Sequence, residues 1–164
     1  MAHRVYVGLG SNLGDRKANV REAEGRLAEL PSTRIVKASS LYESEPHGNA
    51  KTWFINSVLE IETDLEPEAL LKQTLAIEKS MGRKRVTGKR WGSRIIDIDL
   101  LLIDNQTVNK KNLKIPHPEM HARRFVLMPL AELAPHVTHP HLGTSMSELL
   151  GGLKDPKKVM LTRP

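Results

Sequence analysis

The sequence contains no cysteine among its 164 residues, which excludes disulfide bonds and thiolate zinc sites. Aromatic residues are also scarce, with two Trp, two Tyr and two Phe. This composition offers no base-stacking platform of the kind used to bind single-stranded nucleic acid. No apolar run approaches the roughly 20 residues of a membrane-spanning helix, and the first residues lack the hydrophobic segment of a secretion signal. We therefore expect a cytoplasmic protein that contacts no membrane.

The remaining composition indicates one globular domain over residues 1–164. Hydrophobic residues make up 39% and charged residues 27% of the chain, which is long enough to bury a core. Lys and Arg number 25 against 19 Asp and Glu, giving a net charge of +6. This excess favours an anionic partner such as a nucleotide, a nucleic acid or a phosphorylated metabolite. Charge alone does not distinguish such a binding surface from an ordinary solvated one.

Hydrophobic periodicity divides most of the chain into elements in the order strand-helix-strand-strand-helix-strand. The strands are predicted at 3–9, 34–43, 54–63 and 94–103, and the helices at 15–31 and 67–82. Asp15 is suited to cap the first helix, and Pro67 is suited to open the second. This order is typical of a ferredoxin-like split βαβ domain of the α+β class, in which helices pack on a mostly antiparallel sheet.

Local patterns add four smaller predictions. A short helix is expected at 129–134, and Ser145 with Glu148 forms a capping box for another short helix. Leu75 is expected to face the core with the other apolar residues of its helix. Residues 8–12 contain glycines but lack the Lys-Ser/Thr of a P-loop and the third glycine of the dinucleotide fingerprint. We therefore predict a structural turn there.

Two aspartates, Asp97 and Asp99, interrupt the aliphatic run of the last predicted strand. Side chains alternate in a strand, so both carboxylates share one face at a Cα separation of roughly 6.5–7 Å. Carboxylates this close repel one another unless cations lie between them. Inward charges that protect an edge strand are the alternative, but the continuous aliphatic neighbours are typical of a central strand. The pair therefore predicts a metal site, and Mg²⁺ is the ion that phosphoryl transfer uses.

A run of basic residues at 83–94 directly precedes this pair. Most charged runs are solvated loops, but guanidinium groups bind phosphate oxygens in a bidentate manner. Arg94 also stands at the start of the strand, three residues before Asp97. Arg83 and Arg94 are therefore the predicted phosphate contacts. The glycines within and beside the run would allow it to act as a lid over a substrate.

His117 lies between Pro116 and Pro118, and these rigid neighbours fix its direction. A single histidine is most often an ordinary surface residue. The proline bracket, followed by Arg123 and Phe125, favours a role in a binding site instead.

These segments together resemble the 6-hydroxymethyl-7,8-dihydropterin pyrophosphokinase family of folate biosynthesis. The similar segments are 8–15, 39–46, 54–56, 77–83, 90–101 and 115–130. The most specific feature is Arg-Trp-Gly-x-Arg-x-x-Asp-Ile-Asp combined with Pro-His-Pro. The resemblance implies a Mg²⁺-dependent diphosphokinase that transfers pyrophosphate from ATP to the pterin alcohol, giving AMP and the pterin diphosphate.

The resemblance also implies roles for individual residues. It implies that two Mg²⁺ ions are bound by Asp97 and Asp99, and that the triphosphate is contacted by Arg83 and Arg94. Further contacts on the ATP side are implied for Glu78, Arg85, Trp91, His117 and Arg123, with Trp91 closing over the site. The implied pterin pocket is formed by the aromatic faces of Phe54 and Phe125, the amide of Asn56 and the backbone at Ser44. His47 and residues 49–52 depart from the family pattern.

Two other classes of function remain open from the sequence. A basic module that binds RNA or DNA through residues 83–94 would show salt-dependent oligonucleotide binding without Mg²⁺, although the neighbouring carboxylates oppose such binding. A nucleotide sensor on the same scaffold would bind ATP without turnover. We expect instead a monomeric enzyme that acts on small molecules and binds no nucleic acid.

Overall fold

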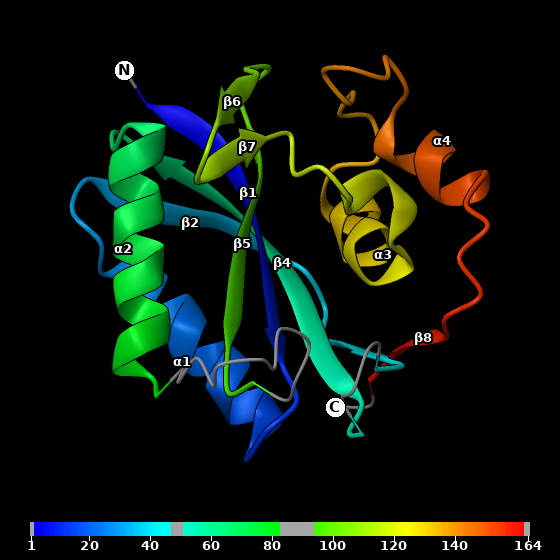
Figure 1. Cartoon of the computed structure of the whole chain (residues 1–164), viewed down its shortest axis with the longest axis horizontal. Coiled ribbons are helices and arrows are strands. Elements are labelled where there is room, and N and C mark those ends of the chain that lie inside the picture. The colour runs from blue at the N-terminus through cyan, green and yellow to red at the C-terminus, as the bar shows by residue number, and fades with distance from the viewer. Residues whose placement is uncertain (1, 47–50, 83–93, 163–164) are drawn as a thin grey trace.

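An antiparallel sheet organises the chain, and the computed structural model describes residues 2–46, 51–82 and 94–162. In this part of the chain the strand order is β5-β1-β4-β3-β8, and β2 also pairs with β4 (Figure 1). The strands are β1 His3–Ser11, β2 Thr33–Ala38, β3 Tyr42–Ser44, β4 Phe54–Thr63, β5 Asp97–Ile103 and β8 Val159–Leu161. All of these pairings are antiparallel, as the α+β prediction requires.

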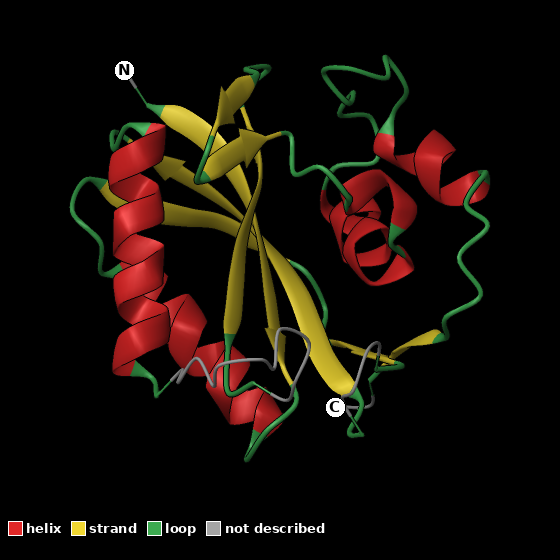
Figure 2. Cartoon of the chain, in the orientation of Figure 1, coloured by secondary structure: helices red, strands yellow, loops and turns green. Residues whose placement is uncertain are grey.

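Helices cover both faces of the sheet. The helices α1 Arg16–Ala28 and α2 Pro67–Ser80 lie on one face, and α3 Arg124–Leu133 lies on the other with α4 Met146–Gly151 against it (Figures 1 and 2). The 3-10 helix Met120–Ala122 leads into α3, and β6 Val108–Lys110 pairs with β7 Leu113–Ile115 in a separate hairpin. No helix within the described residues is long and apolar enough to cross a membrane.

Both long helices begin at the predicted signals. The Asp15 carboxylate accepts a hydrogen bond from the backbone N–H of Ala18 at 3.2 Å, which satisfies a donor of the first turn of α1. Pro67 is the first residue of α2, where its missing N–H has no cost. The inward face of α1 is fully buried at Val20 and Leu27. Local capping and periodicity therefore define these two elements.

Alternation along β1 separates two cores. Val5, Val7 and Leu9 join α1 and α2 in one buried cluster, whereas Tyr6 joins α3 and α4 in the other. By the same alternation, Gly8 and Gly10 belong to the Tyr6 face. The sheet therefore presents a stretch without side chains beside the second core.

The prediction of one continuous strand at 34–43 was wrong, because the structure has two strands there, β2 and β3, with a break between them. The Ser39 hydroxyl accepts the N–H of Val58 at 2.9 Å, in place of a backbone carbonyl. The backbone N–H and the hydroxyl of Ser40 donate to Glu132 on α3 at 2.9 and 3.2 Å. Contacts with a distant helix replace the strand ladder here, and a local pattern does not reveal them.

The short helix predicted from Pro129 was also wrong in its start, because α3 begins at Arg124 and contains Pro129. The Asp155 carboxylate accepts the Arg124 backbone N–H at 3.0 Å and so caps the helix from a remote segment. The predicted start of α4 is confirmed in its N-cap, since Ser145 Oγ accepts the Glu148 N–H at 3.2 Å. The Glu148 carboxylate accepts a hydrogen bond from the Ser145 hydroxyl at 2.9 Å.

The central position predicted for the strand of Asp97 and Asp99 is wrong, because β5 is an edge strand of the described sheet. Two more predictions fail beside a cleft. Leu75 was expected in the core but is 45% exposed, and it lies at the wall of a cleft. Residues 8–12 were expected to form a turn, but β1 continues through Ser11. Leu75 therefore faces the open cleft where its pattern implied packing in the core. The backbone at residues 8–11 runs straight along the cleft where the glycines implied a chain reversal.

Candidate active site

The two aspartates of β5 lie opposite the two glycines of β1. In the antiparallel register Asp99 pairs with Gly8 and Asp97 pairs with Gly10. Ile98, on the other face of β5, is part of the core beneath α1 and α2. The carboxylates therefore share one face, as strand alternation predicts, and the glycines leave the space beside them open.

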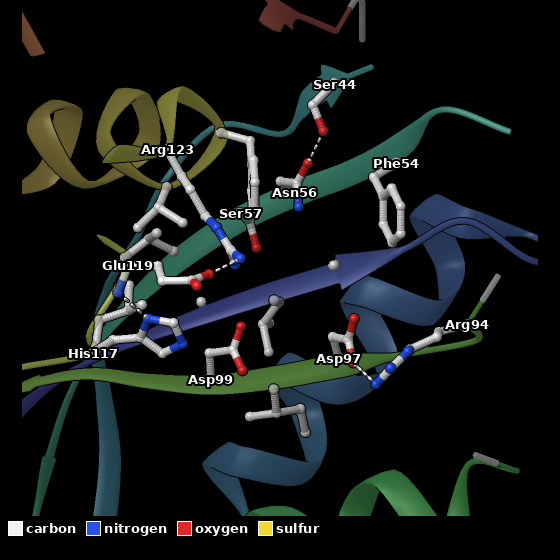
Figure 3. Close-up of a pocket in the computed structure, with 18 of the residues that line it drawn as sticks. Ser44, Phe54, Asn56, Ser57, Arg94, Asp97, Asp99, His117, Glu119 and Arg123 are labelled. Atoms are coloured by element: carbon white, nitrogen blue, oxygen red, sulfur yellow. Dashed lines mark hydrogen bonds and ion pairs between the residues drawn. The ribbon is translucent and has the colours of Figure 1, made fainter. Parts of the chain in front are cut away.

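This face of the sheet forms the floor of a cleft of about 620 Å³ (Figure 3). The structure brings most of the predicted site residues to its walls. They are Ser44, Phe54, Asn56, Glu78, Arg94, Asp97, Asp99, His117, Arg123 and Phe125. The predicted residues Arg83, Arg85 and Trp91 lie outside the described residues, as do His47 and residues 49–50.

One end of the cleft combines an aromatic face with an amide of fixed orientation. Ser44 Oγ on β3 donates a hydrogen bond to Asn56 Oδ1 on β4. The Asn56 Nδ2 group is therefore directed away from Ser44 and into the cleft, beside Phe54 (Figure 3). A Cβ added at Gly10 would approach Asn56 Nδ2 to 2.9 Å, so the glycine is needed for this close packing. A flat ring with polar edges fits such a wall.

The other end carries positive charge around the two carboxylates. Arg94 Nη1 forms an ion pair with Asp97 Oδ1 at 3.0 Å (Figure 3). Arg123 pairs with Glu119, and its guanidinium lies over the Phe125 ring with Cζ 5.7 Å from the ring centroid. Arg123 therefore lies beside both the aromatic wall and the charged floor.

His117 lies beside Asp99 in the cleft, and its backbone N–H donates to the Leu101 carbonyl of β5 at 2.9 Å (Figure 3). Its Nδ1 accepts the backbone N–H of Glu119 at 3.2 Å, so the proton of the neutral ring is on Nε2. Burial lowers the pKa of His117, and the nearby Asp99 carboxylate opposes this shift. His117 can thus offer a neutral N–H donor to a phosphate oxygen.

Glu78 lines the cleft but also supports it from below. The side chain is only 3% exposed, and Oε2 accepts the backbone N–H of Ile98 at 2.8 Å. Ile98 lies between the two aspartates in the chain, so this bond from α2 anchors the central part of the carboxylate strand. The resemblance implied a nucleotide-side contact for Glu78, and the structure adds this anchoring contact.

Sequence reasoning missed three sets of cleft residues. Gly8 and Gly10 were assigned to a turn, although their alternation with Tyr6 was a usable signal. Leu71 and Leu75 add an apolar wall from α2. Glu119, which holds Arg123, follows the Pro-His-Pro motif but carries no distinctive signal of its own.

The fold and cleft together define an α+β enzyme suited to phosphate chemistry on a flat ring. A family model described as 7,8-dihydro-6-hydroxymethylpterin-pyrophosphokinase matches residues 6–135. The chain belongs to this family, and the resemblance seen in the motifs is confirmed. Pyrophosphate transfer to hydroxymethyldihydropterin in folate biosynthesis is the reaction of that family.

Proteins of several organisms show the same relationship over most of their length. The 2-amino-4-hydroxy-6-hydroxymethyldihydropteridine pyrophosphokinase of Methylorubrum extorquens is 44% identical over 157 residues, covering 95% of this chain and 96% of that protein. The Pseudomonas aeruginosa protein of the same name is 44% identical over 151 residues, covering 92% and 91%. The Bacillus subtilis protein is 41% identical over 138 residues, covering 84% and 81%.

Solved structures confirm the fold. An HPPK-DHPS in complex with substrates superposes with a TM-score of 0.73 at 14% identity over 92% of this chain. The wild-type Plasmodium falciparum HPPK-DHPS with STZ-DHP gives a TM-score of 0.74 at 16% identity. This chain spans 43% of the length of each of those chains.

Proposed function

We propose that this protein transfers the terminal diphosphate of ATP to 6-hydroxymethyl-7,8-dihydropterin, giving AMP and the pterin diphosphate. The single observation that carries this assignment is the composition of the cleft. One end offers Phe54 and the oriented Asn56 amide to a ring, and the other offers Arg94, Asp97 and Asp99 to phosphates. Family membership supplies the pterin and the reaction.

The step transfers one group between two oxygens. The hydroxymethyl oxygen of the pterin attacks the β phosphorus of ATP, and a new O–P bond forms. The bond between this phosphorus and the oxygen bridging to the α phosphate breaks, and AMP leaves with that electron pair. The hydroxyl proton is released to solvent or to a phosphate oxygen. Catalysis of this kind depends on positioning and charge stabilisation more than on covalent chemistry by the protein.

The donor set of the cleft fits Mg²⁺. The described residues contain no group of three or more His, Cys, Asp or Glu side chains that could hold a metal. Mg²⁺ does not need such a cage, because it commonly binds one or two carboxylates together with phosphates and water. Asp97 and Asp99 would hold it, and two ions are part of the proposal. When bound, Mg²⁺ supplies charge neutralisation to the phosphate oxygens.

The side chains around the carboxylates have complementary tasks in this proposal. Arg94 and Arg123 bind and orient phosphate oxygens, and His117 Nε2 donates a hydrogen bond to another. The Asn56 Nδ2 group donates to an acceptor on the pterin edge, while Phe54 and Phe125 hold the ring faces. The reacting oxygen and the β phosphorus are thereby held near one another for in-line attack.

The proposal also covers the setting of the reaction. We propose a monomer that acts in the cytoplasm on two small molecules and binds neither nucleic acid nor membrane. The carboxylates of Asp97 and Asp99 would oppose the approach of a nucleic-acid backbone when no metal is bound. Salt-sensitive binding to oligonucleotides without Mg²⁺ would contradict this part of the proposal.

The test is incubation of the purified protein with MgATP and the hydroxymethyl-dihydropterin, followed by nucleotide separation. AMP and pterin diphosphate should appear in equal amounts, and omission of Mg²⁺ should abolish both. Formation of ADP as the sole nucleotide product would overturn the assignment. Binding of ATP without turnover in the presence of pterin would support the sensor alternative.

A further inference from the structure

Asn12, directly after β1, is tied to the backbone of Arg94. The Asn12 backbone N–H donates to the Arg94 carbonyl at 2.9 Å. The Asn12 side-chain Oδ1 accepts the Arg94 backbone N–H at 2.5 Å. Asn12 thus satisfies both backbone groups of Arg94, which stands at the phosphate end of the cleft. At 1% exposure this residue is part of the interior, although it lies outside the regular sheet.

The same side chain also reaches the pterin end of the cleft. Asn12 Nδ2 donates to the backbone carbonyl of Thr52 at 3.3 Å. Thr52 lies two residues before Phe54, the proposed aromatic wall. The next carbonyl, that of Trp53, accepts a hydrogen bond at 2.7 Å from Arg16, which also pairs with Glu43 on β3 at 3.0 Å. The chain leading into Phe54 is therefore held from the β1–α1 side.

We propose that Asn12 is a positioning residue that sets the spacing between the two halves of the active site. Its side-chain amide holds the backbone of Arg94 through the oxygen and the backbone at Thr52, before Phe54, through the nitrogen. Transfer between two bound substrates is sensitive to their separation, and a misplacement of about 1 Å can cost on the order of a hundredfold in rate. This inference rests on the roles proposed above for Arg94 and Phe54.

A simpler role for Asn12 would be to stabilise the β1–α1 connection. Asn19 provides a matched control for that role. Its Nδ2 donates to the Leu13 carbonyl at 2.8 Å and to Ser11 Oγ at 3.2 Å, so it stabilises the same connection. In the described structure it bonds to neither Arg94 nor Thr52. An effect that arises only from the connection should be similar for both asparagines.

The experiment compares Asn12→Ala, Asn12→Asp and Asn19→Ala with the wild-type chain at pH 8.5. Three quantities are measured: kcat for AMP formation, Kd for a nonhydrolysable MgATP analogue, and Kd for the pterin. Urea unfolding gives the folded fraction of each variant. The Asp variant keeps an oxygen that can accept the Arg94 N–H, but its ionised carboxylate cannot donate to Thr52.

We expect Asn12→Ala to lower kcat by about tenfold or more and to weaken binding of both ligands. Asn12→Asp should weaken pterin binding by about fivefold, the effect of one lost hydrogen bond, and leave nucleotide Kd within about twofold. Asn19→Ala should leave all three quantities within about twofold per folded molecule. A larger change in the pterin Kd than in the nucleotide Kd of Asn12→Asp is a result that general destabilisation does not produce.

Equal losses of kcat per folded molecule in Asn12→Ala and Asn19→Ala would overturn the proposal. Equal effects of Asn12→Asp on the pterin Kd and the nucleotide Kd would also overturn it. This second test can be made even if Asn12→Ala does not fold. An Arg94→Ala variant with full activity would instead remove the assumed role of Arg94. AMP formation by the wild-type chain tests the reaction itself, so these failures can be told apart.

Discussion

Arg94 and Asp97 form an ion pair at 3.0 Å on the floor of the cleft. The pair joins a guanidinium that we propose to bind phosphate with a carboxylate that we propose to bind Mg²⁺. The Arg94 guanidinium therefore lies where Asp97 would bind Mg²⁺, and the Asp97 carboxylate lies where Arg94 would bind a phosphate oxygen. A cation and a guanidinium compete for the same carboxylate oxygens, because both are attracted by the same charge. Removal of Arg94 should consequently affect metal binding and catalysis in opposite directions.

Arg94→Ala should bind a divalent cation more tightly when nucleotide is absent. Loss of the partly exposed pair should improve the Kd for Mn²⁺, used as a probe, by about twofold to fivefold. The same variant should lose most of its kcat, because the phosphate contact is gone. Titration of Mn²⁺ by calorimetry and an AMP assay measure the two effects. Arg21→Ala, which breaks an Arg–Glu pair at the same sequence spacing on α1, is the control. Weaker or unchanged Mn²⁺ binding in Arg94→Ala would contradict the proposed competition.

Ser44→Ala should weaken pterin binding and leave nucleotide binding unchanged. Without the hydrogen bond from Ser44, the Asn56 amide is free to rotate and present its oxygen to the cleft. The expected loss in pterin affinity is about fivefold to tenfold, from one buried hydrogen bond and the freed amide. Ligand fluorescence gives the pterin Kd. Ser57→Ala on the same strand is the control, because Ser57 Oγ is buried without a hydrogen-bond partner in the described structure. A similar loss of pterin affinity in both variants would argue against the orienting role.

Asp97→Asn and Asp99→Asn should each lower kcat by about a hundredfold or more while the fold persists. Each substitution removes a carboxylate from the proposed metal face and so removes charge stabilisation in the transition state. It also relieves repulsion between the two carboxylates in the metal-free protein, so the free energy of unfolding should change little. AMP assays at saturating Mg²⁺ and urea unfolding check both statements. Asp64→Asn, at an exposed position between β4 and α2, should be neutral in each assay. Substantial activity in either cleft variant would remove that residue from the metal site.

The part of the site that the sequence predicts is the part encoded by local rules. Alternation in a strand was sufficient to place Asp97 and Asp99 on one face. The proline bracket identified His117 as a candidate, and motif spacing identified the family and, with it, Asn56. Caps at Asp15 and Ser145 located two helix starts from four-residue patterns. Each of these signals depends on residues that are neighbours in the chain.

The features that sequence reasoning missed depend on contacts across long separations. The break between β2 and β3 is supported by Glu132 on α3, and the start of α3 is capped by Asp155. The role of Gly10 becomes clear only when Asn56 is placed on the neighbouring strand. Leu75 has the pattern of a core residue but meets an open cleft. Such tertiary contacts override local preference and cannot be read from one segment.

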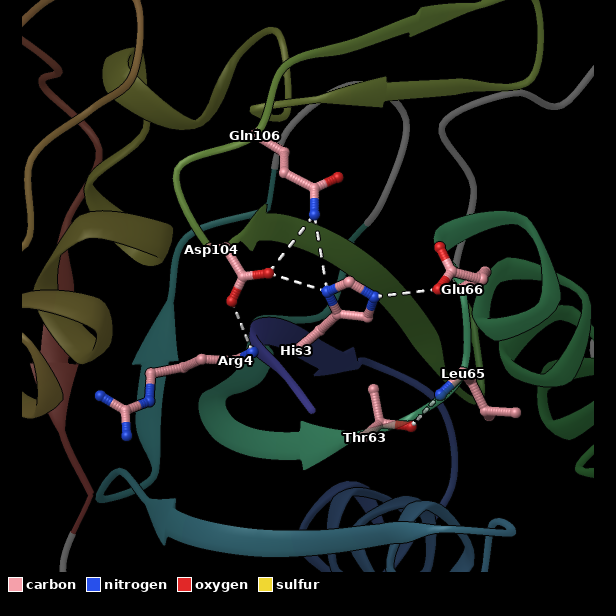
Figure 4. A network of polar contacts seen from close by, with 7 residues as sticks. All are labelled: His3, Arg4, Thr63, Leu65, Glu66, Asp104 and Gln106. Carbon is pink, nitrogen blue, oxygen red and sulfur yellow. Dashed lines mark hydrogen bonds and ion pairs between the residues drawn. The ribbon is translucent and has the colours of Figure 1, made fainter. Parts of the chain in front are cut away.

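A histidine at the opposite end of β1 makes the stability of the fold depend on pH. His3 Nδ1 lies 2.8 Å from Asp104 Oδ2, and His3 Nε2 lies 3.3 Å from Glu66 Oε1 (Figure 4). The hydrogen bond to Asp104 raises the pKa of His3 above its usual value of 6.5. The hydrogen bonds from the Arg4 backbone and from His3 lower the pKa of Asp104 despite its burial. Both groups are therefore charged together in mildly acidic solution.

His3→Asn should destabilise the protein more at pH 5.5 than at pH 8.5. A histidine whose pKa is raised by folding contributes its full stabilisation below the pKa of the unfolded chain, about 6.5, and loses it as pH rises through the folded pKa. The hydrogen bonds from the Arg4 backbone and from His3 lower the pKa of Asp104, so its carboxylate is available to pair with charged His3 at pH 5.5. Urea unfolding of the wild type and the variant at both pH values measures the difference. The exposed His136, replaced by Asn, is the control for removal of a histidine. A larger destabilisation at pH 8.5 than at pH 5.5 would mean that neutral His3 is the stabilising form.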